Sequence, residues 1–306
     1  MEYRQLRYVI QIAAEKNFSR AAEKLHIAQP SLSQQLSKLE KELGVLLFKR
    51  STNAVELTHA GEVFVEKAQH ILDLTEQLTK EMEDMSQMKR GKLVVGSLPI
   101  TGSHILPIVL PAFKQRFPEI EVALVEETSN QLEILSAQGK TDVTLLTLPL
   151  QDSSLAYEEL IQEEVWLALP QNHPLLDKYA PFEEPVPFSE LQNEPFIALK
   201  KGQGFRQITF DLCASYGFTP QIVFESSNIE TVQSLVAAGM GIAFVPEMIA
   251  RTQRSHFVPQ FVTLEGRPYR TIVVAHRKGR YVSKAAEMFI STLKTVLKNS
   301  VSQLRH

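Results

Sequence analysis

The chain has 306 residues, of which 44% are hydrophobic and 22% are charged, and its formal net charge at pH 7 is −3. These proportions are those of a globular protein, and the length allows two or three domains that each bury a core. No apolar run approaches the ~18 residues that span a bilayer, and the polar residues 1–4 do not form a secretory signal, so we expect no membrane association. A single cysteine, Cys213, excludes an internal disulfide and a multi-cysteine metal site and favours a cytoplasmic location.

The charge is unevenly distributed along the N-terminal third of the chain. Residues 1–58 carry nine Lys and Arg against six Asp and Glu, whereas residues 59–90 carry four against seven. A basic head on an acidic body suits a protein that touches a polyanion with one end. An ordinary fluctuation of charge explains this pattern equally well when it is taken alone.

Three short helices are predicted in the first 44 residues. A stripe of apolar residues predicts the first helix over 4–16. Ser19 is placed to cap a second helix that ends near Leu25. A third helix is expected to open at Pro30, where a missing amide proton is tolerated, and to end at Gly44. The stripe of the first helix consists of Leu6, Val9, Ile10 and Ala13.

The third predicted helix has two different faces. One face carries leucines, and the other carries hydroxyl, amide and basic side chains that can reach base edges and phosphates. Residues 45–58, with a basic turn between two β-prone runs, predict a hairpin wing. Together these features favour a DNA-binding winged helix-turn-helix over a small helical bundle with a polar surface. The leucines are Leu32, Leu36, Leu39 and Leu43, and the polar face consists of Ser31, Ser33, Gln34, Gln35 and Lys38.

Residues 19–44 and 47–61 resemble the DNA-binding motif of the LysR-type transcriptional regulators. The resemblance is carried by Ser19-Arg20-Ala21-Ala22-Glu23-Lys24-Leu25, Gln29-Pro30-Ser31-Leu32-Ser33-Gln34-Gln35-Leu36, Leu47-Phe48-Lys49-Arg50 and Leu57-Thr58-His59-Ala60-Gly61. It implies base reading by Gln29, Pro30, Ser33 and Gln34, and phosphate contacts from Ser31, Lys38 and the wing residue Arg50. Gln34 stands where many members have arginine, and Asn53 where the wing is often basic, so we expect modest non-specific affinity.

One long helix is predicted from Thr58, its N-cap, to about Met88. Such a helix spans about 45 Å, and its narrow apolar seam needs a partner or the chain's own body to pack against. The resemblance implies antiparallel pairing in a homodimer or homotetramer, double-stranded DNA with an interrupted palindrome as the operator, and contact with RNA polymerase. A polar hinge follows at 89–92. The seam consists of Phe64, Ala68, Ile71, Thr75, Leu78, Met82 and Met85.

From Leu93 onward, short β-rich runs alternate with helical patterns, which predicts an α/β architecture with parallel strands. Two series of such elements, joined by crossovers near 162–164 and 266–269, resemble a periplasmic-binding-protein-like fold, which is also that of the LysR-type effector domain. Asn228 lies in a capping-box pattern over 227–230. The strands are expected at 93–96, 122–125, 143–146, 165–169, 196–199, 222–224, 242–245 and 271–275, and the helices at 104–117, 130–139, 205–216, 229–238 and 283–298.

The expected fold class is therefore multidomain. It combines an N-terminal, mainly α-helical winged helix-turn-helix over 1–58, a linker helix and hinge over 59–90, and an α/β effector domain of two subdomains over 91–306. Subdomain I comprises 91–163 and 267–306, and subdomain II comprises 164–266.

Ligands of such folds lie at the carboxyl ends of strands, near helix N-termini. The loops there offer hydroxyls, glycines and one arginine, which suits a small-molecule effector that is a carboxylate or similar anion. Arg206, beside two glycines, is the favoured anion-binding residue. Each hydroxyl could instead cap a helix, and Lys200 and Lys201 could be solvated surface. The predicted effector-binding residues are Thr101, Ser103, Thr128, Ser129, Gly202, Phe205, Arg206 and Ser226.

No catalytic motif is visible in the sequence. Gly239-Met240-Gly241 lacks the third glycine of a dinucleotide loop and precedes a strand, and the histidines have no metal-ligand spacing. Cys213 lies on an amphipathic helix and is expected to be a buried thiol. We therefore expect a ligand-responsive regulator that is not an enzyme and needs no cofactor or metal. The alternative is a solute-binding or enzymatic α/β protein with a structural helical head.

Overall fold

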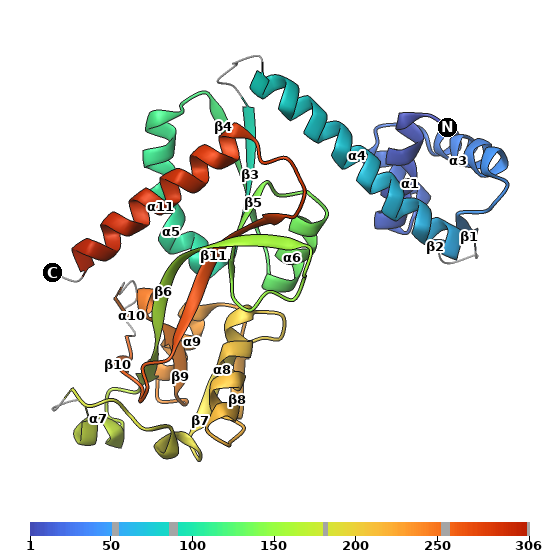
Figure 1. The fold of residues 1–306 in the computed structure, drawn as a ribbon. Helices are drawn as coiled ribbons and strands as arrows, with labels where there is room; N and C mark the ends of the chain where they lie inside the picture. Colours follow the sequence, from blue (N-terminus) through green and yellow to red (C-terminus); the bar gives the residue numbers. More distant parts are fainter. Residues whose placement is uncertain (51–54, 86–90, 180–182, 252–257, 305–306) are drawn as a thin grey trace. The chain divides into compact units, whose positions relative to one another are not determined.

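The computed structural model describes residues 1–50, 55–85, 91–179, 183–251 and 258–304, except for the side chains of Arg50, Glu83 and residues 299–304 (Figure 1). Its contacts divide the chain into two compact units, Met1–Ser86 and Gln87–His306. Among the described residues, no helix is both long enough and apolar enough to cross a lipid bilayer.

The first unit is a winged helix-turn-helix followed by a long helix. Three short helices, α1 (Tyr3–Glu15), α2 (Phe18–Lys24) and α3 (Gln29–Leu43), precede the antiparallel wing strands β1 (Phe48–Arg50) and β2 (Val55–Leu57). Helix α4 (His59–Met85) completes the unit. The core is formed by fully buried apolar side chains from α1, α2, α3 and the start of the wing, which are Val9, Ile12, Ala21, Ala22, Leu32, Leu36, Leu39, Leu47 and Phe48.

The predicted helix ends are confirmed at Gly44 and corrected elsewhere. Gly44 adopts φ +72°, the left-handed conformation that a glycine C-cap provides. The predicted Ser19 cap is wrong, because Asn17 is the N-cap of α2 and its side chain accepts from the amides of Ser19 and Arg20. Helix α3 begins one residue before Pro30, at Gln29, which is compatible with proline because the first amides of a helix have no intrahelical partner.

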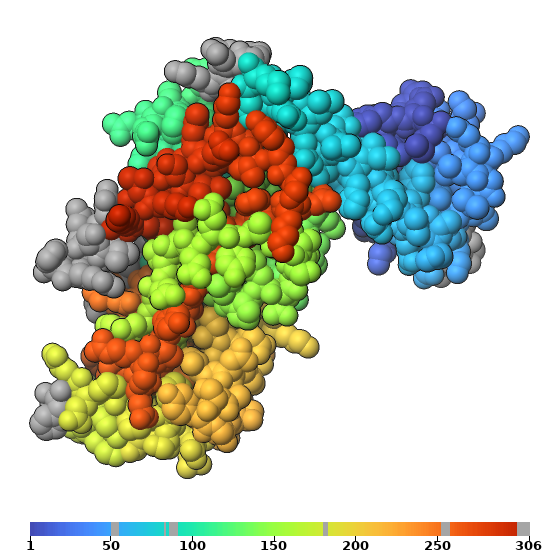
Figure 2. Space-filling model, in the orientation of Figure 1, coloured from blue at the N-terminus to red at the C-terminus, as the bar shows by residue number. Residues whose placement is uncertain are grey.

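Helix α4 uses its two halves differently. Phe64, a position of the predicted seam, packs on the core of the head, and Ala68, another seam position, is buried. Beyond them Leu72 is half-buried but the other apolar side chains are solvent-exposed in this chain, and Figure 2 shows this part of the helix (cyan) leaving the globular head. The predicted end near Met88 lies outside the described residues. The exposed apolar residues of this half are Ile71, Leu74, Leu78, Met82 and Met85.

The second unit is built on a seven-stranded sheet of order β10-β6-β11-β5-β3-β4, with β9 also pairing with β6. Strands β3 (Gly91–Ser97), β4 (Ile120–Glu126) and β5 (Val143–Thr147) are parallel, as predicted. Strand β11 (Tyr269–Arg277) is antiparallel to both β5 and β6 (Leu155–Leu169), so the sheet as a whole is mixed.

Two lobes share this sheet. Residues 155–164 of β6 pair with β11, whereas the end of the same strand pairs with β9 (Ala243–Pro246) and β10 (Gln260–Val262). The chain therefore passes between the lobes near the expected crossover at 162–164, but it does so within one uninterrupted strand, which was not predicted. Residues 155–164 of this strand were not predicted, because they include glutamates at 158, 159, 163 and 164 and glutamate is depleted in strands.

The remaining elements cover the sheet and build the second lobe. Helix α5 (Pro99–Arg116) starts five residues earlier than predicted and tolerates Pro107 and Pro111, which both lie on its exposed face. The capping box predicted to start at Ser227 is wrong, because Asn228 is the N-cap of α9 and its side chain accepts from the amide of Glu230. The other elements are α6 (Ser129–Ala137), β7 (Pro195–Leu199), α8 (Gly204–Ser215), β8 (Gln221–Ser226), α9 (Ile229–Ala237) and α11 (Lys284–Leu304), and the unpredicted short α7 (Pro174–Tyr179), η2 (Phe188–Leu191) and α10 (Glu247–Arg251).

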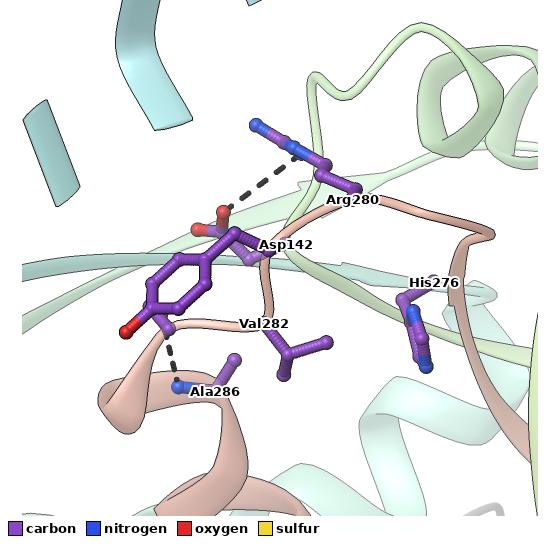
Figure 3. A pocket seen from close by; sticks show the side chains of 7 residues that line it. Asp142, His276, Arg280, Val282 and Ala286 are labelled. Carbon is purple, nitrogen blue, oxygen red and sulfur yellow. Dashed lines mark hydrogen bonds and ion pairs between the residues drawn. The ribbon is translucent and has the colours of Figure 1, made fainter. Parts of the chain in front are cut away.

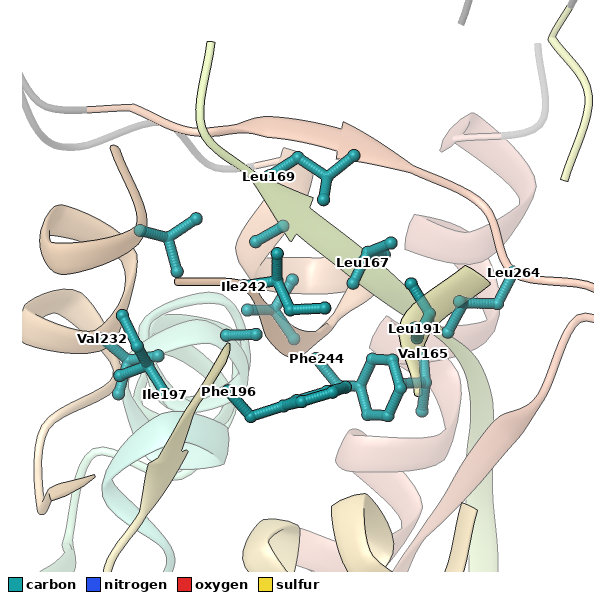
Figure 4. Close-up of a cluster of buried hydrophobic side chains, with 14 of the residues drawn as sticks. Val165, Leu167, Leu169, Leu191, Phe196, Ile197, Val232, Ile242, Phe244 and Leu264 are labelled. Carbon is teal, nitrogen blue, oxygen red and sulfur yellow. The ribbon is translucent and has the colours of Figure 1, made fainter. Parts of the chain in front are cut away.

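Each lobe has its own hydrophobic core. In the first lobe, which contains β3, β4 and β5, Phe113 and Phe289 pack edge to face between the sheet and its helices, with ring centroids 5.3 Å apart. In the second lobe Phe196 and Phe244 pack in the same way among the aliphatic side chains shown in Figure 4. The two lobes therefore have separate cores, although strand β6 belongs to both.

Candidate nucleic-acid interface and effector pocket

Helix α3 presents a polar face opposite its buried leucines. Leu32, Leu36 and Leu39 are at most 1% exposed, which fixes the rotation of the helix on the head. The side chains at the predicted base-reading and phosphate-binding positions lie on the other side. Of these, Gln29, Pro30, Ser31, Gln34 and Lys38 are exposed and Ser33 is half-buried.

The N-terminal turn of α3 is suited to a phosphate oxygen. Its N-cap is Ala28, and no side chain in the described structure caps the turn. The first amides of a helix carry partial positive charge and attract anions when no side chain satisfies them. The Nε2 atom of Gln29 donates to Ser33 Oγ at 2.9 Å, which holds the glutamine along the exposed face. The predicted contact from Arg50 cannot be located, because its side chain lies outside the described part of the chain, as does Asn53.

A small pocket lies in the second unit where the two lobes meet. One wall comes from the end of β3 and the first turn of α5, and the other from the end of β7 and the first turn of α8. Two helix N-termini thus face the same space, together with an arginine at the start of β11. The pocket is lined by Leu98, Pro99, Ile100, Leu199, Gln203, Gly204, Phe205 and Arg270.

Arg270 supplies the charge of this pocket. It is 3% exposed, and it forms an ion pair with Glu163, its register partner on β6. The other carboxylate oxygen of Glu163 accepts from the amide of Met248 at 3.2 Å, which ties the ion pair to α10. One face of the guanidinium lies 5.4 Å from the ring centroid of Phe205. A buried arginine with one edge bonded to a carboxylate has further donors for an anion in the pocket.

The two lobes are in direct hydrogen-bonded contact beside the pocket. The amide of Gly204, the first residue of α8, donates to Ser129 Oγ at 2.9 Å. A Cβ on Gly204 would lie 2.5 Å from this hydroxyl, so the contact requires glycine. The side-chain oxygen of Thr101, in the first turn of α5, is buried and has no hydrogen-bond partner among the described residues. Both hydroxyls belong to the predicted effector set.

The other predicted effector residues lie around the pocket or away from it. Phe205 lines it, whereas Ser103 is exposed and bonds to the carbonyl of Ile100, and Ser226 accepts from the amide of Asn228. Thr128 and Gly202 are partly exposed and are not pocket-lining residues. Arg206, the favoured anion-binding residue, is bonded to the carbonyl of Leu199 and to the carboxylate of Glu225 and is not in the lining.

Arg270 lines this pocket but was not among the residues predicted from the sequence. The available signal was an arginine that comes, after Thr271, just before the apolar run 272–275 and next to the predicted crossover. A charged residue that enters a buried strand is costly unless it is paired or functional.

A second pocket lies in the first lobe, and polar side chains in its lining are bonded to one another and to the backbone (Figure 3). Asp142 accepts from the amide of Val94 at 2.8 Å and faces Arg280 at 4.0 Å. Arg280 also donates to the carbonyl of Thr141 at 3.1 Å. These bonds join β3, the residues just before β5 and the loop before α11, so the polar side chains here have a structural role in the lobe.

The thiol of Cys213 is buried in the core of the second lobe. Burial raises the pKa of the Cys213 thiol to about 12, so it is protonated at neutral pH. Among the described residues, no group of three or more His, Cys, Asp or Glu side chains is arranged to hold a metal ion.

Comparisons with known proteins agree with this architecture. The model of bacterial regulatory helix-turn-helix proteins of the lysR family matches residues 3–62, and the model of the LysR substrate binding domain matches residues 86–298. The chain is 39% identical to the uncharacterized HTH-type transcriptional regulator YcgK of Bacillus subtilis, over 99% of this chain and 97% of the relative. It is 31% identical to the hydrogen peroxide-inducible genes activator of Escherichia coli O157:H7, over 91% of this chain and 90% of the relative.

A solved structure of full length shows the same fold. A full-length OxyR variant from Pseudomonas aeruginosa superposes with a TM-score of 0.72 at 28% identity, over 97% of this chain and 95% of the other. With a matching head, a matching body and relatives along its whole length, this chain belongs to the LysR family of DNA-binding, effector-responsive transcriptional regulators.

Proposed function

We propose that this regulator reads an interrupted palindrome with α3 from each of two subunits. The observation that carries the proposal is the exposed polar face of α3 above a rigid leucine core. Gln29, Pro30, Ser33 and Gln34 meet base edges, and Ser31, Lys38 and Arg50 meet phosphates. A glutamine bonded to adenine through both amide atoms discriminates by roughly 1–3 kcal/mol against another base.

The exposed half of α4 pairs with its counterpart in a second copy. Ile71, Leu78 and Met82 are 43%, 57% and 49% exposed and recur at helical spacing, as in a helix-pairing seam. The seam in this proposal begins at Ile71, because Phe64 and Ala68 are used within the head. A pair of such helices sets the distance between two heads, so we place the protein in dimers or tetramers. The functional divisions are 1–58, 59–90 and 91–306, with subdomains of 91–163 plus 267–306 and 164–266.

A small anion such as a carboxylate is the effector, and Arg270 binds it in the inter-lobe pocket. The arginine is buried, lines the pocket and stands opposite the N-termini of α5 and α8, whose dipoles favour the same charge. Ser129, Phe205 and Thr101 are the other predicted residues that lie close enough to contribute. An anion that inserts between α8 and Ser129 changes how far the lobes close. Arg206 has a weaker claim because it does not line the pocket and is bonded to Glu225 and to the carbonyl of Leu199.

Thiol-based sensing of hydrogen peroxide, suggested by the name of one relative, does not suit this chain. Its sequence contains one cysteine, which is buried and has a raised pKa. A peroxide-reactive thiol is exposed and ionised, and a disulfide needs a second sulfur. The chain therefore responds to a bound molecule. It has no catalytic role, acts in the cytoplasm where the chromosome lies, and acts on RNA polymerase bound nearby.

The DNA-reading proposal is tested by selecting duplexes from a random library with the full-length protein. We expect two related half-sites in the selected sequences. Gln34→Ala should lower the affinity for the selected duplex, relative to a scrambled duplex, by about 5- to 150-fold for each half-site, the equivalent of 1–3 kcal/mol. Gln138→Ala, at an exposed glutamine in the body, is the control and should change nothing. A library with no enriched sequence would refute the proposal.

A further inference from the structure

The start of the wing is bonded to the carboxylate of Glu40, a buried residue on α3. Glu40 is 7% exposed, although it lies on the helix that carries the proposed DNA-reading face. Its Oε1 atom accepts from the amide of Leu47 at 2.8 Å and from the amide of Phe48 at 3.3 Å. Phe48 is the first residue of β1, so a single carboxylate oxygen on α3 accepts both backbone amides at the start of the wing.

The linker helix holds the same short segment from its other side. The amide of Thr58, the residue before α4, donates to the carbonyl of Leu47 at 2.9 Å, and its hydroxyl donates to the carbonyl of Leu46 at 2.7 Å. The same hydroxyl accepts from the amide of Gly61 at 2.9 Å. A Cβ on Gly61 would lie 2.0 Å from the carbonyl oxygen of Leu47, so α4 approaches this segment as closely as backbone permits.

The packing of the side chains adds to these bonds. Leu47 and Phe48 are 1% and 2% exposed, and the Phe48 ring packs edge to face on Phe18 at a centroid distance of 6.3 Å. Lys49, the next residue, is exposed and follows directly on strand β1. The direction in which strand β1 leaves the head at Lys49 is therefore set at Leu47 and Phe48.

We infer that Glu40 is a positioning residue for DNA binding: it fixes the wing relative to α3 and α4, so that the basic residues of β1 reach the phosphates while α3 is in the groove. Glu40 does not touch DNA in this arrangement. Its negative charge alone would repel the duplex, so a loss of affinity when it is removed cannot come from the charge. The inference rests on the proposed DNA-binding function of the head.

Three substitutions separate the geometry of Glu40 from its charge. Glu40→Gln removes the charge but keeps an oxygen at the same reach, so both wing amides can still donate to it. Glu40→Asp keeps the charge but shortens the side chain by one methylene, so it cannot reach both amides. Glu40→Ala removes the acceptor altogether. Glu42→Gln, on an exposed residue of the same helix whose described partner is the N-terminal amine, is the matched control.

The test measures binding of each full-length variant to the duplex selected by the unmodified protein, at a series of salt concentrations and well below each melting temperature. Each phosphate contact contributes about 0.9 to the slope of log affinity against log salt. We expect Glu40→Ala and Glu40→Asp to lower the slope by about 0.9 per head and the affinity by about tenfold. Glu40→Gln and Glu42→Gln should keep the slope of the unmodified protein.

Two results would overturn the inference. One is a folded Glu40→Ala or Glu40→Asp protein with an unchanged slope, because a residue that serves stability alone lowers the melting temperature without changing the slope. The other is a Glu40→Gln protein that loses slope and affinity as Glu40→Ala does, because glutamine keeps an acceptor oxygen at the same reach and the inference requires no more than that acceptor. If Glu40→Ala does not fold, the contrast between Glu40→Asp and Glu40→Gln still decides the matter. Failure of the unmodified protein to select any duplex refutes the DNA-reading proposal instead.

Discussion

Truncating Leu78 on the exposed half of α4 should weaken the pairing of two copies. Leu78 is 57% exposed in the single chain. Full burial of a leucine side chain is worth about 1.5–3 kcal/mol, so covering this fraction contributes about 1–1.5 kcal/mol. In a two-fold symmetric pair the residue is used twice. Leu78→Ala should therefore cost about 2–3 kcal/mol of association and raise the dimer dissociation constant about 30- to 150-fold.

The assay is sedimentation velocity of the full-length protein over a dilution series that crosses the dissociation constant. Glu76→Ala is the control, because Glu76 is exposed on the same helix, two residues away, and its replacement removes no apolar surface. Circular dichroism of both variants reports whether the helix is retained. Equal dissociation constants for Leu78→Ala and Glu76→Ala would refute the assignment of this face to a second copy.

Three further predictions concern the pocket, the thiol and the head. A carboxylate that binds the protein, found by screening a metabolite panel, should raise the melting temperature of the unmodified protein and of Arg206→Ala. It should not raise the melting temperature of Arg270→Ala, and the reverse pattern would place the anion site at Arg206. Because the pKa of Cys213 is about 12, about one thiol in ten thousand is ionised at pH 8, so an alkylating reagent should modify Cys213 in urea but not in the native protein, and rapid native labelling would contradict its burial. Asn17→Ala should lower the free energy of unfolding of the head by about 1 kcal/mol in a urea titration, because two amides of α2 lose their acceptor, and an unchanged midpoint would exclude Asn17 as a cap.

The head was the part of the fold most fully predictable from sequence. Its helices end at residues whose local chemistry is decisive, such as Pro30 at a first turn and Gly44 at a left-handed cap. Its exposed face follows from the leucine spacing of α3. The choice of Asn17 over Ser19 as a cap was not predictable, because both residues can cap a helix and the backbone conformation at position 17 decides between them.

The pocket was less predictable, because it depends on residues that are distant in sequence. Arg270 and Glu163 meet only because β6 and β11 pair in one register, and a hydrogen bond between residues 107 apart has no local signal. The contact of Ser129 with Gly204 likewise joins two lobes whose relative position no sequence pattern gives. The ion pair of Arg206, the predicted anion-binding residue, with Glu225 was likewise not predictable, because Glu225 lies on the following strand.

The most direct test of the account is a hydroxyl-radical footprint of the full-length protein on its selected duplex. Two heads held at a fixed distance should protect two half-sites on one side of the helix, with their centres separated by a multiple of about 10–10.5 base pairs. Gln34→Ala should lose both protected segments together, since each subunit reads its half-site with the same face of α3. A single protected segment, or uniform protection along the duplex, would contradict the account.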